Sequence, residues 1–234
     1  TEIQEYSGYG RYVGPDQGIW NRTCSWGSMP CDFDNDGDLD LLTLLTHGDN
    51  HLFSTVLVNN GSGVFEWSFD LLNSRLNDDP DWGHHGDHCA VWLDFDNDGL
   101  WDLALAESGY DNNRLYLFRQ ESDHTFRCIT RESGLWIIND QNMPVNTMLA
   151  VDYDLDGDDD LIFGGGDNWP IRMFRNDSGN MNHHVSVSLT GSGNAGGSNV
   201  SAVGARVQIV AGNRTITRVI QAGDGHFSPQ MPFR

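Results

Sequence analysis

The segment Asp32-Phe-Asp-Asn-Asp-Gly-Asp-Leu-Asp40 recurs twice further along the chain. The copies are Asp94-Phe-Asp-Asn-Asp-Gly-Leu-Trp-Asp102 and Asp152-Tyr-Asp-Leu-Asp-Gly-Asp-Asp-Asp160, and successive copies start 62 and 58 residues apart. A repeat at this spacing is typical of architectures in which one small structural unit is copied along the chain. The three acidic segments therefore divide much of the sequence into equivalent units.

Short strand-like runs surround each acidic segment in the same order. Runs before a segment are Cys89–Leu93 and Met148–Val151, and runs directly after one are Leu39–Leu45, Leu103–Ala106 and Leu161–Gly164. Third runs are Thr55–Asn59, Arg114–Arg119 and Ile171–Asn176, and fourth runs, in the first two units, are Val64–Trp67 and Phe126–Thr130. Hardly any stretch has helical periodicity. About four strands per unit is the pattern of propeller blades, so we expect an all-β fold with three four-stranded blades, a partial β-propeller, followed by a small β domain.

The composition is acidic and rich in turn-forming residues. The 234 residues include 13 Lys and Arg against 34 Asp and Glu, a net charge of −21, and 28 of the 34 acids are Asp. Asp favours turns and metal sites, and the 27 Gly residues agree with turn-rich β structure. Nucleic-acid binding requires basic patches, so this charge argues against it. No apolar run approaches the length of a membrane span, and we expect no membrane insertion.

The acidic segments have the chemistry of a calcium loop. Carboxylates stand at positions 1, 3, 5 and 9, a glycine at position 6 permits a sharp turn, and position 7 can turn its carbonyl inward. An all-oxygen shell suits a hard cation, and a flexible shell of six to eight oxygens favours Ca²⁺ over Mg²⁺. The predicted ligands of three Ca²⁺ ions are Asp32, Asp34, Asp36, Asp38 and Asp40; Asp94, Asp96, Asp98, Leu100 and Asp102; and Asp152, Asp154, Asp156, Asp158 and Asp160, with Asp38, Leu100 and Asp158 acting through their carbonyls.

The alternative reading of each segment is a solvated acidic turn without a metal. Four carboxylates gathered within a few ångströms repel one another when no cation is present. Binding of the ion would then contribute directly to folding. The occurrence of three copies at the same place in the repeat favours the metal site.

At these residues the chain resembles the FG-GAP/VCBS repeat family of calcium-loaded extracellular β-propellers, over roughly residues 20–182. The segments Asn112-Asn-Arg-Leu-Tyr116 and Ile171-Arg-Met-Phe-Arg-Asn-Asp177 look like the family's strand after the loop. The tail, from His184-Val-Ser-Val-Ser-Leu-Thr-Gly191 to Ala222-Gly-Asp-Gly-His-Phe-Ser228, looks like the ASPIC/UnbV domain of cartilage-acidic-protein-like chains. The expected division is residues 1–182 for the blades, with repeats near 20–70, 82–132 and 145–182, and residues 183–234 for an incomplete ASPIC/UnbV-like domain.

The resemblance implies a secreted, non-enzymatic, calcium-binding protein of adhesion or matrix type. Some relatives in the family bind carbohydrate, so a lectin-like module that binds glycans is the alternative. Family propellers have about seven blades, whereas this chain has three units, and propellers close with four to eight blades. Either the chain is a fragment of a longer propeller, or the open blades of neighbouring chains cover one another in a homo-oligomer or filament.

Two further patterns agree with an extracellular location. Asn-x-Ser/Thr sequons, the acceptors of N-glycosylation, occur at Asn21, Asn60, Asn176, Asn199 and Asn213. The four cysteines, Cys24, Cys31, Cys89 and Cys128, form an even set without a CxxC motif, and we favour the disulfides Cys24–Cys31 and Cys89–Cys128 over four buried thiols. No Gly-x-Ser-x-Gly or His-Glu-x-x-His motif indicates an enzyme.

Overall fold

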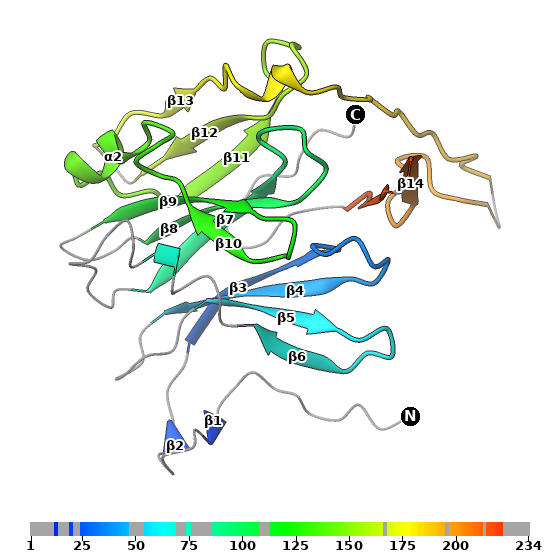
Figure 1. The fold of residues 1–234 in the computed structure, drawn as a ribbon, viewed down its shortest axis with the longest axis horizontal. Helices are drawn as coiled ribbons and strands as arrows, with labels where there is room; N and C mark the ends of the chain where they lie inside the picture. Colours follow the sequence, from blue (N-terminus) through cyan, green and yellow to red (C-terminus); the bar gives the residue numbers. More distant parts are fainter. Residues whose placement is uncertain are drawn as a thin grey trace.

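A computed structural model describes residues 12–13, 19–20, 24–46, 54–68, 74–75, 86–107, 113–165, 168–194, 197–212 and 214–221. The first blade is an antiparallel sheet of β3 (Cys24–Cys31), β4 (Asp40–Thr46), β5 (Thr55–Asn59) and β6 (Phe65–Ser68) in chain order. The second blade repeats this order with β7 (Asp87–Leu93), β8 (Asp102–Glu107), β9 (Arg114–Gln120) and β10 (Phe126–Cys128). The three sheets stack in chain order (Figure 1).

The third blade has three strands in the described residues, β11 (Thr147–Val151), β12 (Asp160–Gly164) and β13 (Arg172–Phe174). The expectation of four strands in every blade is therefore wrong for this sheet. After β13 the chain enters the short 3-10 helix η1 (Gly179–Met181). The Asn182 side chain then donates to the Asp96 carbonyl of the second blade at 2.7 Å, so the chain crosses to its neighbour instead of returning along the sheet.

The remaining elements are small. The strands β1 (Tyr12–Val13) and β2 (Ile19–Trp20) pair with each other, and α2 (Trp136–Asp140) packs against β9. The tail forms a hairpin of β14 (Arg206–Ala211) and β15 (Arg214–Val219). None of the helices in the described ranges is long and apolar enough to span a membrane.

The second blade is buried on both faces because its strands alternate between two cores. Along β7, Cys89 and Val91 face the third blade, whereas Ala90 and Trp92 face the first. The strands β8 and β9 alternate in the same way, with Leu115 and Leu117 on one side and Tyr116 and Phe118 on the other. Successive side chains of a strand point to opposite faces, so a central blade needs a continuous apolar run, and β7–β9 have one.

Neither disulfide that the sequence favoured is present. Cys89 and Cys128 lie on β7 and β10, the opposite edges of one four-stranded sheet, so their backbones are about 14 Å apart at the usual strand spacing. Cys24 and Cys31 are the two ends of β3, roughly 20 Å apart in an extended strand. A disulfide needs Cα atoms within about 7 Å. Cys31, Cys89 and Cys128 are buried thiols, and the Cys89 thiol donates to the Val145 carbonyl at 3.4 Å.

A buried ion network anchors the connection between the first two blades to the second blade. Arg75, in the connection between β6 and β7, is 1 % exposed. Its guanidinium contacts Asp87 at 3.0 Å and Glu107 at 2.9 Å, both carboxylates are buried, and its central carbon lies 4.8 Å from the centre of the Tyr116 ring. Asp87 and Glu107 pair across β7 and β8, so the arginine holds two neighbouring acids that would otherwise repel each other.

Replacing Arg75 with Ala is expected to lower the free energy of unfolding by about 3–5 kcal/mol, because two buried carboxylates lose their cation. Urea denaturation followed by tryptophan fluorescence measures the loss. The control is Arg127→Ala, whose pairs with Glu121 and Glu132 are exposed and should contribute less than about 1 kcal/mol. Equal losses in the two variants would contradict the assignment.

Candidate metal centres

Each acidic segment connects the first strand of a blade to the second. The first loop (32–40) joins β3 to β4, the second (94–102) joins β7 to β8, and the third (152–160) joins β11 to β12. Because the blades stack, these three connections follow one another along one side of the molecule (Figure 1). The repeat therefore places the predicted ligands in equivalent surroundings.

The backbone of the loops is nearly the same in all three copies. Position 6 is glycine with φ of +101°, +87° and +102° at Gly37, Gly99 and Gly157. Position 4 is also left-handed, with φ of +59°, +53° and +64° at Asn35, Asn97 and Leu155. Asn adopts this conformation more readily than other non-glycine residues, so the first two loops are locally favoured and Leu155 is held there by its surroundings.

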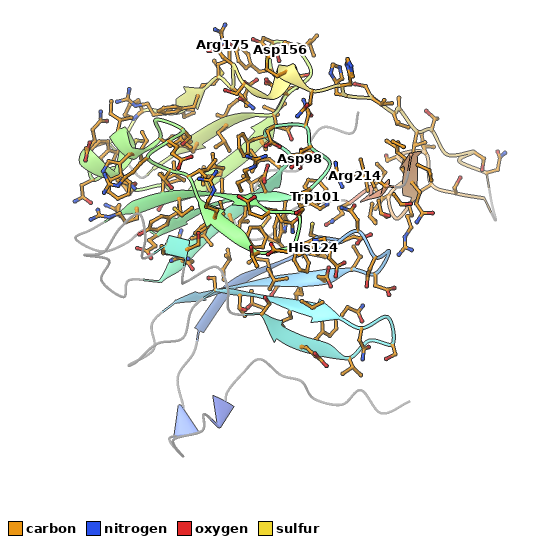
Figure 2. The ribbon with its side chains drawn as sticks, in the orientation of Figure 1. Asp98, Trp101, His124, Asp156, Arg175 and Arg214 are labelled. Atoms are coloured by element: carbon orange, nitrogen blue, oxygen red, sulfur yellow. The ribbon has the colours of Figure 1, made fainter. Side chains whose placement is uncertain are left out.

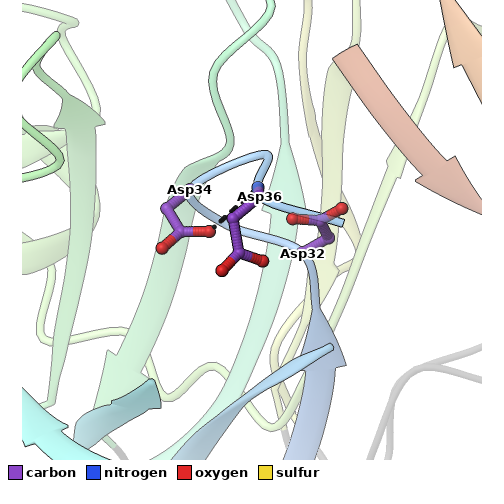
Figure 3. A group of neighbouring side chains, drawn as sticks. All are labelled: Asp32, Asp34 and Asp36. Carbon is purple, nitrogen blue, oxygen red and sulfur yellow. Dashed lines mark hydrogen bonds between the residues drawn. The ribbon is translucent and has the colours of Figure 1, made fainter. Parts of the chain in front are cut away.

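Three carboxylates converge in each loop, with one oxygen of each lying within 4.8 Å of the others. Figure 3 shows Asp32, Asp34 and Asp36 gathered in the curve of the first loop. The equivalent groups are Asp94, Asp96 and Asp102 in the second loop and Asp152, Asp154 and Asp160 in the third. Together the groups use positions 1, 3, 5 and 9, the positions that the sequence assigned to side-chain ligands.

The position 9 carboxylate also organises its blade. Oδ2 of Asp40 accepts a hydrogen bond from the Phe33 N–H at 3.1 Å, and Oδ1 accepts one from the Asn59 N–H at 2.8 Å. These bonds join the loop to the end of the third strand. The same pair of bonds recurs at Asp102, from Phe95 and Gln120, and at Asp160, from Tyr153 and Asn176.

Two carboxylate oxygens in the loops have no hydrogen-bond partner in the described part of the chain. Oδ2 of Asp32 and Oδ1 of Asp96 are buried without a hydrogen bond among the described residues. A buried polar atom without a partner is costly, and a bound cation would satisfy it. The donor set, carboxylates with backbone carbonyls nearby, contains only the hard oxygen ligands that Ca²⁺ prefers. The residues present therefore fit the ion that the sequence predicts.

Burial and mutual repulsion disfavour the charged carboxylates. Burial, with a smaller contribution from the neighbouring loop carboxylates, raises the pKa of Asp102 to about 9, that of Asp40 to about 7 and that of Asp94 to about 6. Burial also raises the pKa above its usual value at Asp32, Asp34, Asp96 and Asp154. A cation in the loop would offset this cost because it favours the ionised forms.

Arginines neutralise part of the second loop. Arg119 of β9 contacts Asp96 at 2.8 Å and Asp98 at 3.8 Å. Arg218 of β15 contacts Asp94 at 3.2 Å, and its guanidinium carbon lies 3.9 Å from the centre of the Trp101 ring. These cations offset part of the negative charge around a metal ion in the second loop. The second loop therefore has the least negative surroundings of the three loops.

The C-terminal hairpin lies against the first two loops. Arg214 donates to the Asp98 carbonyl at 2.9 Å, and the Thr217 N–H donates to Oδ1 of Asn35 at 3.0 Å. Figure 2 places Arg214 beside Asp98 and Trp101, on the side of the blades where the hairpin lies. The tail therefore covers the loops, a contact that the sequence did not predict.

The indoles serve packing more than surface recognition. Trp92 is buried between the first two blades, Trp101 lies against Arg218, and Trp136 lies against Arg131 at 3.4 Å from ring centre to guanidinium carbon. Among the tryptophan side chains that the structure describes, Trp169 is the exposed one. The described part of the chain thus offers little of the aromatic surface that sugar stacking would use.

The sequons differ in how they are held. Asn21 and Asn213 lie outside the described residues. Asn60 and Asn199 are exposed, and the side-chain nitrogen of Asn199 donates to the Val203 carbonyl at 2.8 Å. The side-chain nitrogen of Asn176 instead donates to two backbone carbonyls of neighbouring loops, and a glycan on that nitrogen would break this arrangement. Asn176 is therefore held by structural contacts in this fold, and glycosylation of the five sequons stays a prediction.

Comparison with known proteins supports part of this picture. Residues 94–163 match the FG-GAP-like repeat. The match begins at the first residue of the second loop and includes the whole of the third loop. FG-GAP repeats form propeller-like modules that are typical of extracellular proteins and generally have no enzymatic activity. No curated protein matches the chain significantly. The ASPIC/UnbV resemblance of residues 183–234 stays a prediction.

Sequence reasoning missed the residues that connect the loops. An amide residue ends the third strand of the first two blades, at Asn59 and Gln120, and lies two residues after it in the third, at Asn176. Its N–H donates to the position 9 carboxylate. This regularity is visible when the units are aligned, so the repeat itself carries a signal for it. Arg119 and Arg218 carry no such signal, because their partners are distant in sequence.

Replacing Arg218 with Ala is expected to weaken docking of the β14–β15 hairpin, because it removes the ion pair with Asp94 and the stacking on Trp101. Amide hydrogen exchange in residues 206–219 should become about tenfold faster, while exchange in β7–β9 stays unchanged. Val210→Ala on the same hairpin is the matched control, since Val210 is 72 % exposed. An unchanged hairpin in the Arg218 variant would refute the contact.

Proposed function

We propose that this chain is an extracellular calcium-binding protein of structural or adhesive type, in which each of three FG-GAP-like blades holds one Ca²⁺ ion. The observation that carries the proposal is the threefold convergence of carboxylates in equivalent loops, together with buried oxygens of Asp32 and Asp96 that have no hydrogen-bond partner among the described residues. The ligands in each loop are the carboxylates at positions 1, 3, 5 and 9 and the carbonyl at position 7.

The ion would act as a structural element of the blade. Its charge compensates carboxylates whose ionised form is disfavoured by burial, and its ligands come from the end of one strand and the start of the next. An ion present at 100 times its dissociation constant adds about 2.7 kcal/mol of stability per site. The nearby arginines favour weak sites, with dissociation constants of about 10⁻⁴–10⁻³ M, the range of extracellular calcium modules.

Apolar side chains on the outer faces of the end blades support assembly as the structural role. On the third blade, Leu149, Ile162 and Met173 stand opposite one another across the three strands, and Met173 is 49 % exposed. On the first blade, Leu41 and Leu57 pair on the face turned away from the second blade. The third blade of one copy packing on the first blade of another would repeat the contact already made within the chain, and such head-to-tail contacts form filaments when the rotation does not close.

Asp34→Ala is expected to remove one bound ion, because position 3 supplies a carboxylate to the first site. Equilibrium dialysis with ⁴⁵Ca²⁺ should give three ions for the natural chain and two for the variant, and the melting temperature in calcium should fall. Asp140→Ala, which removes an exposed carboxylate outside the loops, should leave the stoichiometry unchanged. The same number of ions in all three proteins would overturn the ligand assignment.

Assembly is tested by light scattering of the purified chain in calcium and again in EGTA. We expect particles larger than one chain in calcium, and their dissociation in EGTA as the loops lose their ions. Met173→Glu should reduce the particle size without changing the calcium stoichiometry, because it places a charge on the outer face of the third blade. A monomer under both conditions would overturn the assembly role, and glycan-array binding by that monomer would favour the lectin-like alternative.

A further inference from the structure

Two asparagines at position 4 join successive loops. Nδ2 of Asn35 in the first loop donates to the carbonyl of Gly99 in the second at 3.2 Å. Nδ2 of Asn97 in the second loop donates to the carbonyl of Gly157 in the third at 2.9 Å. Donor and acceptor occupy the same positions, 4 and 6, in both pairs. The third loop has Leu155 at position 4, with the same left-handed backbone and a 67 % exposed side chain that cannot donate.

The acceptor carbonyl belongs to the peptide unit that positions a predicted calcium ligand. The N–H of that unit, on Leu100, donates to Oδ1 of Asp98 at 2.9 Å, and the equivalent N–H of Asp158 donates to Oδ1 of Asp156. A peptide unit is planar, so fixing its carbonyl also fixes the direction of its N–H. The asparagine of one loop thereby orients the position 5 carboxylate of the next.

A second set of amides connects the loops in the opposite direction. Nε2 of Gln120, from the second blade, donates to the Phe33 carbonyl of the first loop at 3.0 Å, and Nδ2 of Asn176, from the third blade, donates to the Phe95 carbonyl of the second. In both residues the backbone N–H is held by the position 9 carboxylate of its own blade. Each neighbouring pair of loops is thus linked at position 2 as well as at positions 4 and 6.

We propose that Asn35 and Asn97 couple calcium binding at neighbouring loops, so that an ion in one loop raises the affinity of the next. The inference rests on the proposed function, since it concerns the same three sites. An ion that orders its loop fixes the position 4 asparagine, which then holds the next position 5 carboxylate in place before an ion arrives. The second ion then binds a loop that is already partly ordered, so less conformational entropy is lost on binding. The coupling is reciprocal, because each ion raises the affinity of the other site by the same factor.

The test uses the full chain with the Asp34→Ala change, which leaves the second and third sites and, of the two position 4 links, the one through Asn97. Stepwise calcium binding is followed by calorimetry, with native mass spectrometry counting the ions. We expect the second ion to bind about fivefold or more above the statistical limit for independent sites. Adding Asn97→Leu should abolish this excess while two ions still bind. The third loop accommodates leucine in this backbone conformation at Leu155.

Leu155→Asn is the matched control, because it adds the donor to a loop that has no following loop among the described residues, and it should leave the excess unchanged. If the Asn97→Leu chain does not fold, Asn97→Gly provides the same loss of the donor with a residue that suits positive φ. Two ions that bind independently with Asn97 intact would overturn the coupling and leave the calcium sites standing. Absence of bound calcium would instead overturn the proposed function.

Discussion

The carboxylate that begins the second strand of each blade is the contact on which the rest of the structure depends. Its two oxygens hold the backbone of the acidic loop and the end of the third strand, and this pair of bonds is repeated at Asp40, Asp102 and Asp160. The group is buried, and burial raises its pKa strongly in the first two blades. The fold thus accepts an electrostatic cost at the point where strands and loop meet, and a nearby cation is the simplest compensation.

The same contact connects metal binding to the packing of the blades. The amide residue bound to the position 9 carboxylate reaches back to the preceding loop at Gln120 and Asn176, and the position 4 asparagines reach forward. The alternating strands of the second blade bury both faces between its neighbours. Loops and cores therefore stack with the same periodicity, and the proposed coupling between calcium sites rests on this arrangement.

The C-terminal hairpin adds a charge of the opposite sign to this stack. Arg218 joins Asp94 of the second loop to Asn35 of the first and lies on Trp101. The Asp-rich loops of a chain with a net charge of −21 would otherwise repel one another. The hairpin thus gives the tail a role in the stability of the loops, whichever family its sequence resembles.

Much of the fold was predictable because each repeat consists of short-range sequence patterns, an acidic loop and the strand-like runs around it. The third strand of the first blade was predicted with the bounds that β5 has, and the predicted run Arg114–Arg119 differs from β9 by one residue. The all-β prediction is confirmed, as is the FG-GAP interpretation over residues 94–163. The predicted disulfides were wrong because cysteines that are close in sequence need not be close in space. Cys24 and Cys31 lie at the two ends of one extended strand, and Cys89 and Cys128 lie on opposite edges of one sheet.

The sequence by itself determined the repeat, the strand order within a blade and the placement of the carboxylates, because each depends on residues a few positions apart. Turn geometry at Gly37, Gly99 and Gly157 and the alternation along β7 are local properties of this kind. Only the tertiary structure decided which amide reaches which loop, that the third blade lacks a fourth strand in the described residues, and that Arg218 lies on the second loop. These contacts join residues that are 60 to more than 120 positions apart in the sequence. They form only when the blades stack, so no short-range sequence pattern predicts them.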